Sequence, residues 1–210
     1  MVSVMRLATY SSFFCSILAL LGPMIYYYIH ITLMNSNIIN WPFFEALALI
    51  SMLSTFFYAL SLAMIGDGVC RGGEKFGAHS AYPAGTSVII SGIPIGAFAL
   101  VLAIKFVPMI FLRKINKMIL LATNNCARSF LFLKAMFLIP LALYFFNTRK
   151  KRGVLGCIGT ILVVVNTCIA ITLLRLYLWL LVSMGYILIG FSLYKQSNDF
   201  LLIHKQNCTH

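Results

Sequence analysis

Long apolar runs are the feature of this chain that most limits what it can fold into. There are five: residues 7–34, 43–65, 88–112, 118–146 and 154–194. A bilayer crossing takes about 20 apolar residues, so each of the first four runs can form one transmembrane helix. The fifth, at about 41 residues, is long enough for two. We therefore predict an all-α, polytopic membrane protein with about six transmembrane helices, in which residues 1–210 form a single membrane domain and residues 195–210 a polar C-terminal tail.

The last two runs leave the number of spans open. The fourth, residues 118–146, contains polar and basic side chains in its first two thirds: Asn124, Asn125, Arg128 and Lys134. A charge near the bilayer centre costs about 2.5–3.5 kcal/mol on insertion scales. The run therefore either spans with its cations compensated or forms a re-entrant or interfacial segment, which leaves five spans. In the fifth run we expect a turn near Arg175, with one long tilted helix or a partly interfacial segment as the alternatives.

The longest polar stretch, residues 66–87, contains six glycines. Because glycine readily adopts positive φ, we predict that this stretch is a flexible connector loop. The alternative is a loop that folds back onto the membrane face or holds a ligand with its backbone amides.

Glycines at helical spacing also occur in two of the apolar runs. Gly92 and Gly96 form a small-xxx-small pair, and Gly153, Gly156 and Gly159 recur every three residues. Small residues allow transmembrane helices to approach closely, so we predict that both groups are helix-packing positions. Pro94, between the first two, offers the alternative of a broken helix, which is where transporters place binding sites.

The charge balance indicates partners and orientation. Sixteen Lys and Arg against four Asp and Glu give a net charge of +12, and on an apolar chain this favours anionic lipid over nucleic acid. With six spans, one side of the membrane holds nine basic residues: Arg6, Arg71, Lys75, Arg149, Lys150, Lys151, Arg152, Lys195 and Lys205. The other holds four: Arg113, Lys114, Lys117 and Arg175. The positive-inside rule then places both termini in the cytosol, or in the matrix of a mitochondrion.

Four cations lie within or beside apolar runs, and Glu45 is the acidic residue that lies near one. The four are Lys105, Arg128, Lys134 and Arg175. Intramembrane ionisable residues are functional candidates by default. Since these cations cannot neutralise one another, we expect them, together with Asn124 and Asn125, to bind a lipid phosphate, an acidic residue of a partner helix or an anionic substrate.

The sequence lacks the motifs that are typical of catalytic and cofactor-binding sites, so it does not indicate a catalytic function. The sequence has no GxSxG, GxGxxG or Walker pattern and no metal-ligand spacing, so we expect no cofactor and no metal. We predict a non-catalytic subunit, assembly factor or regulator that associates with anionic lipid and with other membrane subunits or further copies of itself. One alternative is a small transporter or channel for an anionic or lipid-like solute. Another is a lipid-modifying enzyme that uses His79 and Asp67.

Overall fold

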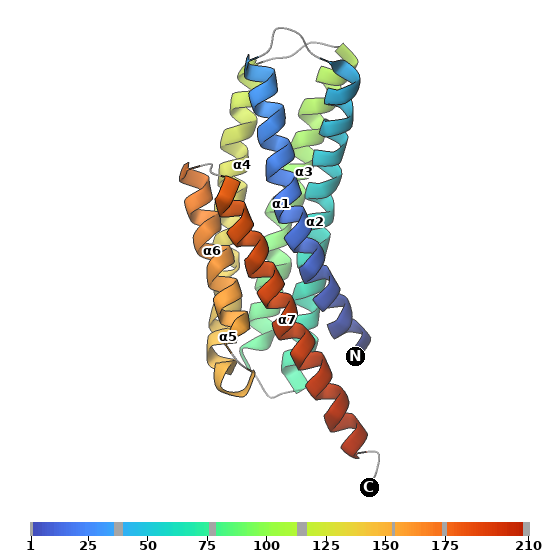
Figure 1. Ribbon diagram of the computed structural model, residues 1–210, viewed down its shortest axis with the longest axis vertical. Coiled ribbons are helices and arrows are strands. Elements are labelled where there is room, and N and C mark those ends of the chain that lie inside the picture. Colours follow the sequence, from blue (N-terminus) through green and yellow to red (C-terminus); the bar gives the residue numbers. More distant parts are fainter. Residues whose placement is uncertain are drawn as a thin grey trace.

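The computed structural model describes residues 2–35, 40–75, 79–112, 117–152, 154–173 and 176–207, which form α-helices over nearly their whole length. The helices are α1 (Val2–Asn35), α2 (Trp41–Lys75), α3 (Ala81–Leu112), α4 (Lys117–Phe137), α5 (Ile139–Arg152), α6 (Leu155–Leu173) and α7 (Leu176–Asn207). All run roughly along one axis, and both ends of the chain lie at the same end of the bundle (Figure 1).

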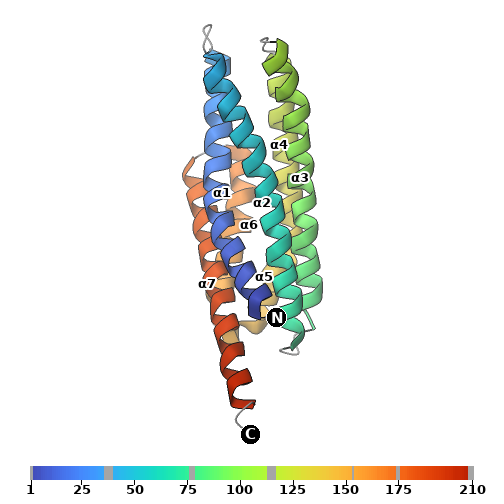
Figure 2. The same cartoon turned by 90° about the vertical axis from the view of Figure 1, so that its right-hand side faces the viewer.

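The helices form a closed ring of six passes, in which α4 and α5 together make one pass. α2 packs between α1 and α3, α1 packs against α7, and α7 packs against α6. α4 and α5 close the ring because they contact both α3 and α6. Figure 2 shows α3 and α4 together on one side of the bundle and α7 on the other. Side chains that point into the ring are therefore enclosed by the chain itself.

Among the described residues, five helical segments are long and apolar enough to cross a bilayer. They are Ser3–Gly22, Trp41–Gly73, Ala81–Leu112, Ala122–Arg149 and Leu178–Asp199. The sixth pass is α6, which contains a shorter apolar stretch, Leu155–Ile169. The outer faces of the helices carry large exposed apolar side chains, such as Ile104 and Phe111. The all-α, polytopic membrane fold predicted from the apolar runs is therefore confirmed.

The fourth apolar run makes a full pass with a break in the middle. α4 ends at Phe137 and α5 begins at Ile139. At the break, the Leu138 N–H donates to the carbonyl oxygens of both Lys134, at 3.2 Å, and Ala135, at 3.1 Å. Pro140 has no N–H to donate to the preceding turn, and this interrupts the helix. The two helices follow one another down the bundle (Figure 1), so the re-entrant alternative is not what the structure shows.

The prediction of a flexible loop over residues 66–87 is wrong. α2 continues as a helix to Lys75 and α3 begins at Ala81. Several of the glycines lie where the two helices cross: a Cβ on Gly66 would be 2.5 Å from the Gly85 carbonyl oxygen. In water a glycine-rich polar stretch favours a loop, but between membrane helices the same small residues allow the backbones to touch.

The fifth run forms two helices, as predicted, since α6 ends at Leu173 and α7 begins at Leu176. Arg175, where the sequence predicts the turn, is outside the described residues, as is Gly153. α7 continues as a helix to Asn207, so the predicted polar tail is helical over residues 195–207. In Figure 1 the upper ends of α6 and α7 lie well below those of α1 to α4.

Candidate functional site: a buried lysine and an unpaired arginine

The interior of the ring contains a lysine whose side chain is fully buried. Lys134 lies on α4, four residues before the break at Leu138, and its exposed fraction is 0%. Its Nζ donates a hydrogen bond to the Tyr58 hydroxyl. Lys134 forms no ion pair among the residues that the structure describes, so its charge has no carboxylate partner there.

Two tyrosines from different helices surround this amine. Tyr58 lies at the middle of α2 and Tyr186 on α7, and the Tyr58 hydroxyl donates to the Tyr186 hydroxyl at 2.9 Å. The rings meet edge to face, with centroids 5.8 Å apart. Lys134 Nζ lies 4.6 Å from the Tyr58 ring centroid and 5.4 Å from that of Tyr186. The site is thus built from α2, α4 and α7 at once.

The two rings offset part of the cost of burying Lys134. A desolvated cation–π contact contributes up to about 2 kcal/mol, against at least about 2.5–3.5 kcal/mol for a cation near the bilayer centre. The rings stabilise the ammonium through their quadrupoles, but they carry no net charge. The cluster therefore lowers the cost of burial without neutralising the cation.

α1 completes the cluster. Cys15 is fully buried, within electrostatic range of Lys134, and its thiol lies against the Ser61 hydroxyl of α2. Ser12 donates to the Tyr186 carbonyl oxygen at 2.8 Å, which ties α1 to α7 beside the same tyrosine. We refer to Lys134, Tyr58, Tyr186, Cys15 and Ser61 as the interior cluster.

Arg128 occupies a different environment on the same helix. It is six residues before Lys134, which is about 9 Å along the axis, and its side chain is partly buried. Its Nε is buried and has no hydrogen-bond partner among the described residues, and Arg128 forms no ion pair with them. A buried, unsatisfied donor on a cation is costly, and the described residues offer this group no acceptor.

The remaining predicted polar positions lie outside the interior cluster. Asn124 is partly buried and Asn125 is exposed on α4, and Lys105 is partly buried near the end of α3. The sequence therefore grouped residues that the fold separates: Lys134 points into the ring, whereas Asn125 faces outward from α4.

The predicted packing glycines lie at helix contacts of unequal closeness. A Cβ on Gly92 would be 2.9 Å from the Ala59 carbonyl oxygen, whereas one on Gly96 would meet only the Ala59 Cβ, at 3.8 Å. A Cβ on Gly159 would be 2.6 Å from the Gly185 carbonyl oxygen, and one on Gly156 would overlap the Phe145 ring. α6 and α7 thus approach backbone to backbone at Gly159, and the α3 pair contributes one close contact.

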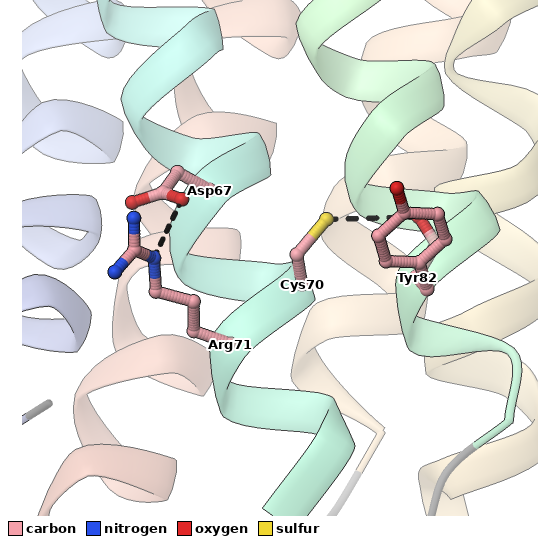
Figure 3. Close-up of polar contacts among 4 residues, drawn as sticks. All are labelled: Asp67, Cys70, Arg71 and Tyr82. Atoms are coloured by element: carbon pink, nitrogen blue, oxygen red, sulfur yellow. Dashed lines mark hydrogen bonds and ion pairs between the residues drawn. The ribbon is translucent and has the colours of Figure 1, made fainter.

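The carboxylate considered for acid–base catalysis is engaged elsewhere. Asp67 accepts from Arg71 Nε at 2.8 Å, one helical turn along α2. On another side of the helix, Cys70 Sγ contacts the Tyr82 carbonyl oxygen of α3 at 3.6 Å (Figure 3). His79 is exposed in the turn before α3, and no hydrogen bond joins it to Asp67 in the described part of the chain. Within that part, no three His, Cys, Asp or Glu side chains gather to hold a metal ion.

Sequence reasoning found Lys134 but missed its tyrosine partners. A local signal was present, since membrane tyrosines normally gather near the interfaces, and Tyr58 and Tyr186 fall well inside apolar runs. A tyrosine at mid-membrane depth needs a hydrogen-bond partner for its hydroxyl, and this pointed to a polar contact in the interior.

The fold and these sites define a polytopic helical membrane protein with an enclosed lysine and an arginine whose buried Nε has no acceptor among the described residues. Comparison of the chain with known protein families, with curated proteins and with solved structures finds no match.

Proposed function

We propose that this protein is a non-catalytic subunit, assembly factor or regulator of a membrane complex, and that it binds an acidic transmembrane helix of another protein against α4. The observation that carries the proposal is Arg128, whose Nε is buried without a partner among the described residues. A carboxylate on a neighbouring helix supplies both the acceptor and the counter-charge that this group needs.

The outer face of α4 suits a helix as the partner. Its exposed residues follow helical spacing: Ala122, Asn125, Ser129, Phe132, Leu133 and Met136. The first three are small or polar, and Asn125 and Ser129 lie within one helical turn of Arg128. Small residues allow a second helix to come close, and Asn and Ser side chains can hydrogen-bond across the contact. These side chains are exposed, so the described chain leaves this face of α4 open to a partner.

A partner helix explains Arg128 better than a lipid headgroup does. Arg128 lies six residues, or about 9 Å, inside the apolar segment that begins at Ala122. Arg128 is partly exposed, and the nitrogen that is buried without a partner is Nε. A carboxylate at the same depth on an adjacent helix would meet the exposed part of the guanidinium, whereas a headgroup would lie about 9 Å away along the axis.

Photo-crosslinking in native membranes tests the proposal. A photoreactive amino acid replaces Ser129 in the full-length protein, and the same residue at Ile104, which is 72% exposed on α3, serves as the matched control. We expect one specific membrane protein to be captured from position 129 and not from position 104. Arg128→Gln should reduce the capture at least about tenfold, since a hydrogen bond to a charged group contributes about 1.5–3 kcal/mol.

A charge exchange gives the decisive result. Arg128→Glu should abolish capture, and a basic residue in place of the partner's intramembrane acid should restore it, while Lys105→Gln should leave capture unchanged. Capture of lipid alone from position 129 would show that Arg128 binds an anionic lipid and would contradict the proposed partner helix. Capture of a second copy of this chain would make the assembly homo-oligomeric. Equal capture with Arg128→Gln would remove Arg128 from the interaction.

We also propose that both termini face the cytosol or the matrix. The described basic residues at the end of the bundle that carries the termini include Arg6, Arg71, Arg149 and Lys195, and such an excess favours the cytosolic or matrix side. A glycosylation acceptor inserted between residues 36 and 39 should be modified in microsomes, whereas one inserted between 76 and 78 should not. The reverse pattern would show that the termini face the opposite side of the membrane.

A further inference from the structure

We propose that the C-terminal end of α5 is a binding site for an anionic phospholipid whose headgroup carries more than one negative charge. Four cations follow one another there in the sequence and form the last turn of the helix: Arg149, Lys150, Lys151 and Arg152. The proposal does not depend on Arg128, which lies 21 residues before Arg149, or about 30 Å along the same pass of the ring.

The first step is charge. α5 packs against α3, α4, α6 and α7. The acidic residues of the sequence are Glu45, Asp67, Glu74 and Asp199, so α3, α4, α5 and α6 contain none. The helices that pack against α5 therefore offer one carboxylate, Asp199, for four adjacent cations, and α7 also carries basic residues of its own. An anionic headgroup supplies the counter-charge that these helices lack.

The second step is the depth of Arg149 in the membrane. Arg149 is the last residue of the apolar segment Ala122–Arg149, and the end of a spanning segment lies at the level of the lipid headgroups. Its Cζ lies 3.9 Å from the centroid of the Phe146 ring, which is exposed on the outer face of α5. Arg149 is itself exposed and forms no ion pair with the described residues. Its N–H groups can therefore donate two parallel hydrogen bonds to one phosphate.

The third step is the apolar face that leads to Arg149. Ile139, Leu143 and Phe146 are all exposed and follow one another at helical spacing along α5. Asn147 and Arg149 are exposed where this face ends. A phospholipid matches the arrangement, because its acyl chains can lie along the apolar face while its phosphate meets the cations. A free phosphate ion would use only the cations, so the apolar face favours a lipid.

The fourth step is the number of charges. Four consecutive helical residues span only about 4.5 Å along the axis, so the four cations of α5 are concentrated at one level of the membrane. A basic residue near an anionic surface strengthens binding about fivefold. A headgroup with two phosphates offers two negative charges at that level, and it should bind more tightly than a headgroup with one.

Lipid binding to the purified full-length protein in detergent, followed by native mass spectrometry, tests the proposal. The probes are cardiolipin, with two phosphates, phosphatidylglycerol, with one, and phosphatidylcholine, which is neutral overall. We expect cardiolipin to bind more tightly than phosphatidylglycerol and at least about tenfold more tightly than phosphatidylcholine. Equal binding of cardiolipin and phosphatidylglycerol would overturn the requirement for more than one charge, and equal binding of all three would overturn the site. Free glycerol phosphate should not displace cardiolipin; displacement would show that the site takes free phosphate and would overturn the assignment to a lipid.

Variants locate the site on the protein. Arg149→Gln should weaken cardiolipin binding about fivefold, and replacement of all four cations by Gln should reduce it to the level of phosphatidylcholine. Arg6→Gln, which removes an exposed cation of α1 at the same end of the bundle, is the matched control and should bind as the wild type does. If the fourfold variant does not fold, Arg149→Gln decides, since its side chain is exposed. Equal loss in Arg6→Gln and Arg149→Gln, or no loss in Arg149→Gln, would overturn the assignment to α5.

The test is independent of the proposed partner helix. Arg128→Gln should bind cardiolipin as the wild type does, even though it loses its partner. Loss of cardiolipin binding in Arg128→Gln would place the lipid at Arg128 and overturn the assignment to α5. Normal cardiolipin binding by a protein that captures no partner would leave this proposal standing and refute the proposed function alone.

Discussion

The crossing of α2 and α3 at Gly85 should not tolerate a side chain. A Cβ on Gly85 would lie 2.3 Å from Cys70 Sγ, 2.5 Å from the Gly66 carbonyl oxygen and 2.8 Å from the Cys70 amide nitrogen. Two of these three atoms belong to the α2 backbone, so relief requires the helices to separate. To reach an ordinary contact of 3.4 Å, the Gly66 oxygen must move by 3.4 − 2.5, or about 0.9 Å. Overpacking of this kind costs about 1–3 kcal/mol, and we expect Gly85→Val to lie in the upper half of that range.

Gly96→Val on the same helix is the matched control. A Cβ there would meet only the Ala59 Cβ, at 3.8 Å, and valine has a slightly higher helix propensity than glycine. We expect the unfolding free energy of this variant to lie within about 0.5 kcal/mol of that of the wild type. Both variants make the same chemical change in the same helix. The difference between their unfolding free energies therefore measures the effect of the close contact between α2 and α3 at Gly85.

The assay is reversible unfolding of the purified protein in mixed micelles with increasing denaturing detergent. Fluorescence of Trp41 and Trp179 follows the transition, because Trp179 is buried on α7 and Trp41 begins α2. Equal unfolding free energies for the two variants would refute the reasoning, because they would mean that α2 and α3 are not held in backbone contact at Gly85.

Two further predictions test other contacts. Ser12→Ala removes the 2.8 Å bond to the Tyr186 carbonyl oxygen between α1 and α7 and should lower the unfolding free energy by about 0.6–1.7 kcal/mol. Thr86→Ala, whose hydroxyl bonds only within α3, should cost less in the same detergent titration. In a single-cysteine series, membrane-permeant maleimide should modify the partly exposed Cys126 in the folded protein, whereas the fully buried Cys15 should react only after unfolding. Equal rates would show that the ring does not enclose Cys15.

The helices themselves could be predicted from the sequence because each follows from local composition. The runs at residues 7–34, 43–65 and 88–112 are apolar over a full bilayer thickness, and all three lie within single helices. The division of residues 154–194 followed from length alone. In lipid, the backbone has to satisfy its hydrogen bonds within each spanning segment, so apolar length determines helix formation almost without tertiary information.

The prediction of a loop at residues 66–87 was wrong because the structure of this stretch depends on tertiary contacts and not on local composition. Glycine and charged residues lower the local apolarity, and in isolation this composition favours a loop. The tertiary partner decides the outcome: Gly66 faces Gly85, and Gly73 would place a Cβ 1.8 Å from the Ala81 Cβ. A single sequence does not show which residues will meet across two helices.

The sequence predicted only part of the candidate site, because the rest depends on contacts between helices that are far apart in the sequence. Lys134 and Arg128 could be found because a cation in an apolar run is conspicuous wherever the chain folds. Their different surroundings could not be predicted, because two residues six positions apart on a helix face different sides: Lys134 points into the ring, and the Arg128 Nε has no partner among the described residues. The bond from Lys134 to Tyr58 joins positions 76 residues apart, and no local pattern encodes it.

The order of Tyr58, Lys134 and Tyr186 along the chain also sets an order of events during synthesis. Tyr58 leaves the ribosome before Lys134, so the amine can find its first partner as soon as α4 enters the bilayer. Tyr186 follows 52 residues after Lys134, and until α7 arrives the lysine is only half satisfied. A chain truncated before Tyr186 therefore exposes a polar defect inside the membrane, and this is a feature that cellular quality control can recognise as a sign of incomplete assembly.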